Sequence, residues 1–371
     1  MPTLDWIRKD KVINHHNDVP YKVLERKYSF DESGMHKEDI HSNNMIIHGD
    51  NLEALKSLLP QYEGKIKCIY IDPPYNTGNE GWIYNDNVND PKIKKWLGEV
   101  VGKEGEDLSR HDKWLCMMYP RLVLLQKLLA DDGAIFISID DNEHANLLLV
   151  CNEVFGSNNF IQDIIWNKRV SPARDAKFFS TDHEYILVYS KNKESLTTHF
   201  LPRTEKNNSY YKNPDNDPRG PWNSAAYTCN KSRDERPNLY YPITNPYTGE
   251  KIFPKESAVW AYSEETYQQH VRDNLLYWGV NGEAKQPRKK AFLSEVGDVV
   301  PRSVWSHSDV GSTQKATMEN NTIFNMRAFS YPKVSTLVER IIQIASDKDS
   351  IVLDSFAGSG TTAHAVLNMN K

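Results

Sequence analysis

A short apolar stretch that ends in an acid, two prolines and an aromatic residue constrains this chain more than any other feature. Residues 66–71 read as a buried strand, and Asp72-Pro73-Pro74-Tyr75 follows at once. Proline fixes φ and has no N–H group, so the turn is rigid and leaves carbonyl acceptors. Open α/β sheets bind ligands at the carboxyl ends of their strands. The motif therefore predicts a site at a strand tip, where Asp72 offers a carboxylate and Tyr75 a flat ring for a heterocycle with an exocyclic amino group.

A second strand-and-turn motif lies near the end of the sequence. Residues 350–354 read as a buried strand, 355–360 as a glycine bend and 361–367 as a helix. This order presents free N–H groups at a helix N-terminus, which favours a ligand that carries a carboxylate. No lysine follows the last glycine, so the bend is not a phosphate-binding P-loop, and the dinucleotide fingerprint G-x-G-x-x-G is incomplete. Asp354, at the strand end, is placed to meet a cationic group.

Composition narrows the class of protein without identifying it. The chain has 371 residues, 39% of them hydrophobic, which is enough for a large core and two domains. Four cysteines without a C-x-x-C pair indicate a reducing interior, and we expect neither disulfides nor a bound metal. No signal peptide or bilayer-spanning apolar run is visible, so we expect a cytoplasmic protein without membrane contact. The formal charge of −5 gives no support for nucleic-acid binding by itself.

Changes in composition divide the chain into four parts. Residues 1–45 are polar and are expected to pack on a larger body as an N-terminal extension; the expected anchors are Trp6, Tyr21, Tyr28 and Phe30. Residues 46–190 alternate strand and helix patterns and predict an α/β domain, with 76–110 as a lid or binding loop. Its expected strands are one from residue 46 up to a helix at 51–59, and then 66–71, 134–139, 161–167 and 183–190. Residues 191–325 read as an inserted domain of short strands whose aromatic residues mostly form a local core, and 326–371 return to the α/β domain.

One basic run in the inserted domain is a candidate for phosphate contact. The run is Lys285-Gln286-Pro287-Arg288-Lys289-Lys290. Lys285, Arg288, Lys289 and Lys290 are therefore the predicted nucleic-acid-binding residues. A solvated surface loop explains the same run equally well.

The two strand-and-turn motifs together resemble those of the β-group amino methyltransferases of DNA. In that family Asp-Pro-Pro-Tyr precedes Phe-Ala-Gly-Ser-Gly, a circularly permuted order, as it does here. Other segments that fit the family are Ile46–Asn51, Trp166-Asn167-Lys168, Asp182–Tyr189 and Tyr331-Pro332-Lys333. Asn14-His15-His16 and Lys212–Trp222 resemble modification subunits of type III restriction–modification systems. The resemblance covers almost the whole chain.

The resemblance implies a Rossmann-like methyltransferase sheet that uses S-adenosylmethionine. The catalytic part would be 46–190, the target-recognition domain 191–325 and the cofactor part 326–371. The implied reaction is methyl transfer to adenine N6 of a base flipped out of duplex DNA. The Asp72 side chain and the Pro73 carbonyl would accept hydrogen bonds from the amino group, and Tyr75 would stack on the base.

The resemblance also implies the cofactor contacts and the partners. The implied cofactor-binding residues are Asp50, Lys333, Asp354, Phe356, Ala357, Gly358, Gly360 and Thr361. The implied partners are double-stranded DNA, a restriction subunit with nuclease and translocase activity, and a second copy of the chain, in a prokaryotic cytoplasm.

One departure from the family leaves more than one function open. The sequence stops at Lys371, soon after the glycine bend, so we expect the family's further strands to be missing. With them would go an acid that hydrogen-bonds the cofactor ribose, and we expect weak cofactor binding. A cytosine-N4 methyltransferase uses the same chemistry, but those enzymes more often carry serine in place of Asp72. An RNA methyltransferase and a non-catalytic DNA-recognition subunit also stay open.

Overall fold

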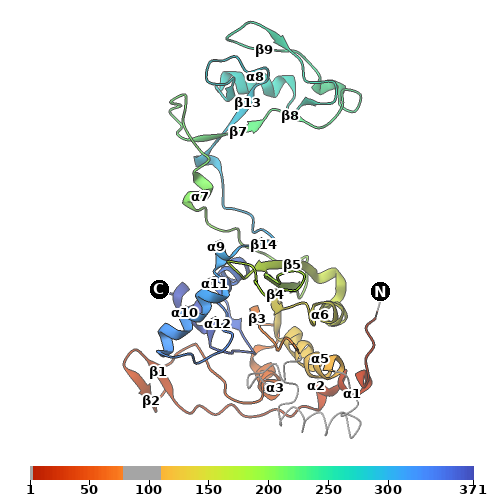
Figure 1. Cartoon of the computed structure of the whole chain (residues 1–371), viewed down its shortest axis with the longest axis vertical. Helices are drawn as coiled ribbons and strands as arrows, with labels where there is room; N and C mark the ends of the chain where they lie inside the picture. Colours follow the sequence, from red (N-terminus) through yellow and green to blue (C-terminus); the bar gives the residue numbers. More distant parts are fainter. Residues whose placement is uncertain (1–2, 78–109) are drawn as a thin grey trace. The chain divides into compact units, whose positions relative to one another are not determined.

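The computed structural model describes residues 3–77 and 110–371. The chain divides into two compact units, one formed by residues 1–199 with 301–371 and the other by residues 200–300 (Figure 1). Most of the 76–110 segment, predicted as a lid or binding loop, lies outside the described residues. In the described part of the chain, no helix combines the length and the apolar character needed to cross a membrane.

The first unit is built on a six-stranded mixed sheet. Its strands are β3 (Ile66–Ile71), β4 (Leu129–Ile139), β5 (Phe160–Asn167), β6 (His183–Ser190), β14 (Val304–Trp305) and β15 (Val352–Leu353). Their order is β14-β5-β6-β4-β3-β15, and β6 alone runs opposite to the other five. The carboxyl ends of β15, β3, β4 and β5 therefore share one edge, which we call the site edge.

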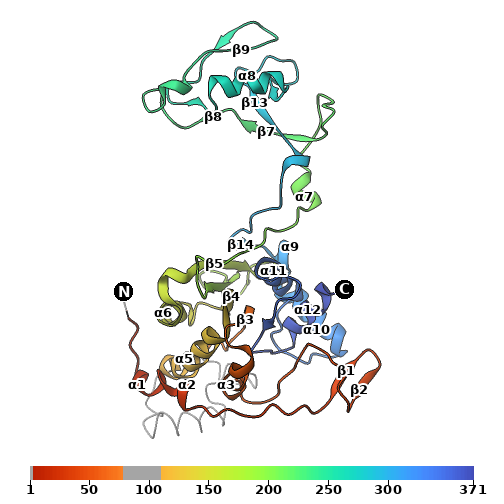
Figure 2. The ribbon, with the colours of Figure 1, turned by 180° about the vertical axis from the view of Figure 1, so that it is seen from behind.

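Helices cover both faces of this sheet. They are α3 (Asn51–Tyr62), α5 (Arg110–Leu128), α6 (His144–Cys151), α9 (His307–Val310), α10 (Thr313–Phe324), α11 (Ser335–Ala345) and α12 (Thr361–Met369). On one face, a buried core joins Ile69 and Ile71 to apolar residues of α3, α5 and α6. On the other, α11 packs against β3, β4 and α12, and Figures 1 and 2 show the two helix layers on opposite sides of the strands. This is the predicted α/β fold class, and it explains why all of β3 is buried. The strand expected just before α3 is absent: residues 46–50 form no strand, and Ile46 is 92% exposed, so this segment lies outside the sheet.

The N-terminal region packs on α5 through its first residues only. Its elements are α1 (Lys9–Val12), α2 (His15–Asp18), β1 (Ser29–Asp31) and β2 (Gly34–His36). Trp6 is buried in the same core as α5. Tyr21, Tyr28 and Phe30 are 60%, 57% and 68% exposed, so the prediction that they anchor this region is wrong. Phe30 lies on a hairpin of two three-residue strands, which has too little surface to bury the ring, and residues 21–28 before it form no helix or strand.

The second unit has a three-stranded sheet and an aromatic core. Its elements are α7 (Glu205–Asn208), β7 (Trp222–Ala226), β8 (Thr228–Cys229), β9 (Ile243–Thr244), β10 (Lys251–Ile252), β11 (Val259–Trp260), α8 (Glu264–Arg272), β12 (Leu276–Tyr277) and β13 (Arg288–Phe292). β13 lies between β12 and β7 in an antiparallel sheet. The buried core consists of Tyr227, Tyr241, Ile243, Trp260, Tyr267 and Trp278. This confirms that aromatic residues of the region form a local core.

The second unit is shorter than the insertion expected at 191–325. Residues 301–325 contribute β14, α9 and α10 to the first unit, because β14 pairs in parallel with β5 and α9 packs against α11. β14 has only two residues, so no sequence period marks where the chain re-enters the main sheet.

Candidate active site

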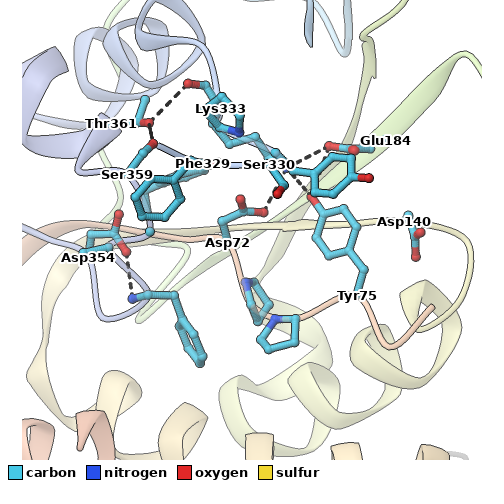
Figure 3. Close-up of a pocket in the computed structure, with 18 of the residues that line it drawn as sticks. Asp72, Tyr75, Asp140, Glu184, Phe329, Ser330, Lys333, Asp354, Ser359 and Thr361 are labelled. Carbon is cyan, nitrogen blue, oxygen red and sulfur yellow. Dashed lines mark hydrogen bonds and ion pairs between the residues drawn. The ribbon is translucent and has the colours of Figure 1, made fainter. Parts of the chain in front are cut away.

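The two predicted motifs meet in one cavity at the site edge. β15 and β3 are parallel neighbours, with Val352 opposite Cys68 and Leu353 opposite Ile69. The cavity has a volume of about 280 Å³ (Figure 3). Its lining comes from both motifs and four further segments: Tyr70, Asp72, Pro73, Pro74, Tyr75, Thr77, Asp140, Lys168, Glu184, Phe329–Lys333, Asp354, Phe356–Ser359 and Thr361. All four predicted catalytic residues line it, as do six of the eight predicted cofactor residues; Gly360 and Asp50 do not.

The proline turn is held from behind by buried side chains. The indole Nε1 of Trp114 donates to the carbonyl of Pro74 at 2.6 Å. Asn76, in the left-handed region with φ 57°, donates its amide to the carbonyl of Arg110 at 3.2 Å and to the buried carboxylate of Glu143. These bonds fix the turn on both sides of Tyr75. Because Trp114 occupies the carbonyl of Pro74, the Pro73 carbonyl stays the better candidate acceptor for a substrate.

A cluster of four charged groups surrounds the hydroxyl of Tyr75. The Lys333 ammonium lies 3.0 Å from Asp72, 3.1 Å from Glu184 and 2.6 Å from the Tyr75 hydroxyl. The Tyr75 hydroxyl donates to Glu184 at 3.1 Å, and Lys168 donates to the other Glu184 oxygen at 2.8 Å. We call Asp72, Glu184, Lys168 and Lys333 the charge cluster; it holds two acids and two bases.

The charge cluster sets the protonation of its members. Burial raises the pKa of Asp72; Lys333 opposes this effect and Glu184 adds to it. Burial alone would raise the pKa of Glu184, but Lys333 and Lys168 outweigh it and lower that pKa to about 2. Burial alone would lower the pKa of Lys333, but Asp72 and Glu184 outweigh it and raise that pKa. Glu184 and Lys333 are therefore both charged at neutral pH, and Asp72 is the carboxyl group whose ionisation depends most on its neighbours.

Sequence reasoning assigned Lys333 to the cofactor and missed Glu184 and Lys168. The structure places the Lys333 ammonium against Asp72 and Glu184, which are its counterions. Its predicted contact with the cofactor stays a proposal. Glu184 is 6% exposed at the start of β6. An acid near the beginning of an otherwise apolar strand was the one available signal for it. Lys168 directly follows β5, at the same edge.

The glycine bend forms the other wall of the cavity. Asp354 accepts hydrogen bonds from the Phe356 N–H at 2.9 Å and the Thr362 hydroxyl at 2.6 Å. Gly360 precedes α12 with φ 77° and gives the helix no side-chain cap, so the first N–H groups of α12 have no partner within the helix. Ser355 has a buried hydroxyl without a hydrogen-bond partner among the described residues. Ser355 does not line the cavity, so the N–H groups at the start of α12 are the polar groups of the bend that a ligand can satisfy.

Asp50 has a structural role that sequence reasoning did not assign. Its carboxylate accepts from the N–H groups of Leu52 at 2.9 Å and Glu53 at 3.3 Å, which makes it the N-cap of α3. Its side chain is 49% exposed, so room remains for a further contact. Its predicted contact with the cofactor adenine remains a proposal.

The basic run of the second unit does not act as one surface. Lys290 is 2% exposed and its ammonium pairs with Asp215 at 2.5 Å and Asp217 at 2.9 Å. The structure therefore contradicts Lys290 as a phosphate contact, because its charge is already neutralised inside the unit. Lys285 and Arg288 are exposed, and Lys289 is half-buried beside the ring of Tyr262.

Asp354 gives the site a pH dependence that needs no ligand to measure. Burial raises the pKa of Asp354 to about 6, although Thr362 and the Phe356 N–H oppose this effect. An aspartate in an unfolded chain ionises near pH ~4, so the folded protein binds more protons between about pH 4 and 6 and loses stability as the pH rises through this window.

Asp354→Asn should remove this loss. Relative to the parent, the variant should gain about 1–2 kcal/mol of unfolding free energy between pH ~4 and ~7, since solvent screens part of the effect at a half-buried site. Urea unfolding of both proteins at several pH values measures the difference. Equal pH slopes for the two proteins would contradict the raised pKa.

Comparison with known proteins assigns the chain to a family. The sequence profile of the N6/N4 DNA methylase family matches residues 66–371, so the chain belongs to this family, as the motifs predict. The Mod subunit of the type III restriction-modification enzyme StyLTI from Salmonella typhimurium is 36% identical over 90% of this chain and 51% of that protein. The EcoPI Mod subunit from Escherichia phage P1 is 32% identical over 100% of this chain and 61% of that protein. The chain thus spans between half and two thirds of the length of these relatives.

A methyltransferase of a type II system and a solved structure are also similar to this chain. The type II methyltransferase M.KpnI from Klebsiella pneumoniae is 32% identical over 89% of this chain and 78% of that protein. Among solved structures, the cytosine-N4-specific PvuII DNA methyltransferase is 12% identical with a TM-score of 0.43, over 87% of this chain and 77% of that one. The latter score is too low to add to what the sheet topology shows.

Proposed function

We propose that this chain transfers a methyl group from S-adenosylmethionine to N6 of adenine in duplex DNA. The observation that carries the proposal is the position of Asp72 and Asp354 at neighbouring tips of β3 and β15, in one cavity. Membership of the DNA methylase family supports the reaction class. The relatives that are Mod subunits support a role as the modification part of a type III system.

The glycine-bend side of the cavity fits the amino-acid end of S-adenosylmethionine. The uncapped N-terminus of α12 suits a carboxylate, and Asp354 suits an ammonium group. The volume of about 280 Å³ lies close to the lower end of the range for small-molecule pockets, which begins at about 300 Å³.

When bound, S-adenosylmethionine supplies a methyl group activated by a sulfonium. The chain's own residues must make a weak amine nucleophilic. The carboxylate of Asp72 and the carbonyl of Pro73 accept hydrogen bonds from the amino hydrogens, which favours a localised lone pair as the new bond forms. The ring of Tyr75 supports the base by stacking, while its hydroxyl is held by Lys333 and Glu184. A paired base cannot reach this cavity, so the target must leave the duplex, at a cost of a few kcal/mol.

The proposed partners follow from the same relatives. Residues 200–300 would form the target-recognition unit, and double-stranded DNA is the substrate. A restriction subunit and a second copy of the chain are proposed partners, in the cytoplasm of a prokaryotic cell.

Mapping of modified bases tests the proposal. The chain is expressed in cells that lack adenine methylation, and their DNA is sequenced by a long-read method that detects modified bases, with empty-vector cells as control. We expect N6-methyladenine at one short recurring sequence, and nucleoside mass spectrometry should show N6-methyladenine rather than N4-methylcytosine. Detection of N4-methylcytosine alone would show that the chain is a cytosine-N4 methyltransferase instead, and unmodified DNA would contradict the proposal.

A further inference from the structure

The loop between β5 and β6 leaves the sheet beside the candidate active site. β5 ends and β6 begins at the site edge, with Trp166 paired to Glu184 and Asn167 to His183. Lys168, at the start of the loop, and Glu184, just after it, both line the cavity. Residues 168–182, which we call the β5–β6 loop, therefore begin and end where a substrate would enter.

Hydrogen bonds close the base of this loop and leave its tip in solvent. The Lys168 N–H donates to the Asp182 carbonyl at 2.9 Å. Further out, the Ala173 N–H donates to the Ser180 hydroxyl at 2.6 Å, and that hydroxyl donates to the Asp182 carboxylate at 2.5 Å. Residues 174–179 beyond these bonds are all exposed. The tip is thus presented on a closed base rather than on a loose strand end.

The tip carries two adjacent aromatic rings that nothing in the described chain covers. Phe178 is 82% exposed and Phe179 is 93% exposed. Rings so exposed gain nothing from the fold of their own unit, since burial is what makes an aromatic side chain stabilising. Single exposed apolar residues are ordinary, but two neighbouring phenylalanines at a loop tip mark an interaction site.

The charges around these rings favour DNA as the occupant. The β5–β6 loop contains four basic and two acidic residues, a formal charge of +2 in a chain of −5. Arg169, Arg174 and Lys177 are exposed, and the Lys177 ammonium lies 5.2 Å from the centre of the Phe178 ring. Basic groups contact phosphates, while apolar side chains that enter a duplex separate stacked bases. A protein partner would explain the exposed rings but would not explain the positive charge of the β5–β6 loop.

We propose that the tip of the β5–β6 loop enters the duplex at the target site, where Phe178 and Phe179 occupy the space left by the extruded base. The arginines and the lysine hold the flanking phosphates. This inference rests on the proposed function, because a cavity that takes an adenine requires the base to leave the helix. Aromatic stacking on bases is worth about 1–3 kcal/mol per base, which is comparable with the cost of extruding one.

The test uses the double variant Phe178→Ala/Phe179→Ala, with Phe30→Ala/Met35→Ala as a matched control. The control removes two apolar side chains that are each 68% exposed on the β1–β2 hairpin. Methylation is measured on the mapped target sequence in two forms, fully paired and with an abasic site opposite the target adenine. The loop variant should lose about tenfold or more in kcat/KM on the paired duplex and much less on the abasic one, whose target is already unpaired. Parent-like rates on paired DNA, or equal losses on both duplexes, would overturn the inference.

Binding gives a readout that does not depend on methyl transfer. By fluorescence anisotropy, the parent should prefer an abasic duplex over a paired one, and the loop variant should prefer it more strongly, because the variant loses affinity mainly for the paired duplex. A preference that is unchanged or smaller in the variant overturns the inference, even if the parent methylates nothing and the proposed function fails. Light scattering tests whether the tip instead contacts a second copy of the chain. If the parent and the control variant are dimers and the loop variant is a monomer, the tip is a contact between copies and the inference is overturned.

Discussion

Asp72→Ala should lower the rate of methyl transfer by about 1,000-fold or more while DNA binding persists. Stabilisation that is concentrated at the reacting atoms is worth about 100- to 1,000-fold per group, and removal of Asp72 also changes the partners of Lys333. Single-turnover methylation with labelled cofactor measures the rate, and anisotropy on the mapped duplex measures binding.

Asp132→Ala is the matched control for this experiment. Asp132 also pairs with a lysine, with its carboxylate 2.6 Å from Lys67, but it lies toward the amino end of β4, away from the site edge. The control should methylate like the parent. If Asp72→Ala retains methylation within about tenfold of the parent, Asp72 is not an acceptor for the substrate and the proposed chemistry must be abandoned.

The parts of the fold that local patterns determine were predictable. The strands expected at 66–71 and 183–190 are β3 and β6, residue for residue. Each is a short stretch dominated by apolar residues and bounded by a turn or a polar segment, a signal contained in the strand itself. Strand ends that carry chemistry also meet at a common edge of an open sheet, so the meeting of Asp72 and Asp354 followed from the motifs.

The partners of charged side chains were not predictable, because packing selects them. Lys290 sits in a basic run, yet it is neutralised by two aspartates more than 70 positions away in the sequence. Lys333 follows a proline in a cofactor-side motif, yet its ammonium reaches across the cavity to Asp72. Sequence shows which residues carry charge, but the approach of distant segments decides which charges meet.

Glu184→Gln should lower kcat by about 10- to 100-fold, although Glu184 is not expected to touch the reacting amine. Glu184 is a positioning residue. It accepts a hydrogen bond from the Tyr75 hydroxyl at 3.1 Å and forms an ion pair with Lys333, which also pairs with Asp72. Without the Glu184 charge, Lys333 keeps Asp72 as its one carboxylate partner in the charge cluster. Asp72 is then held more strongly as an ion pair and accepts less well from a substrate.

A pH profile separates this role from simple loss of structure. Glu184 raises the pKa of Asp72 by repulsion, so its removal should lower that pKa. The acid limb of kcat should therefore move to lower pH in Glu184→Gln, while the plateau falls and KM for DNA changes little. Glu153→Gln is the matched control, because Glu153 also pairs with a lysine and a tyrosine, Lys9 at 2.7 Å and Tyr119 at 3.2 Å.

Stability has to be measured beside activity, because removing one partner of a buried ion pair costs about 3–5 kcal/mol. Lys168→Met/Glu184→Gln removes one charge of each sign and should recover part of that loss. Its kcat should nevertheless stay low, since Lys333 still has Asp72 as its only carboxylate partner within the charge cluster. Recovery of both stability and kcat would show that Glu184 serves the fold alone, and an unmoved acid limb would show that it does not tune Asp72.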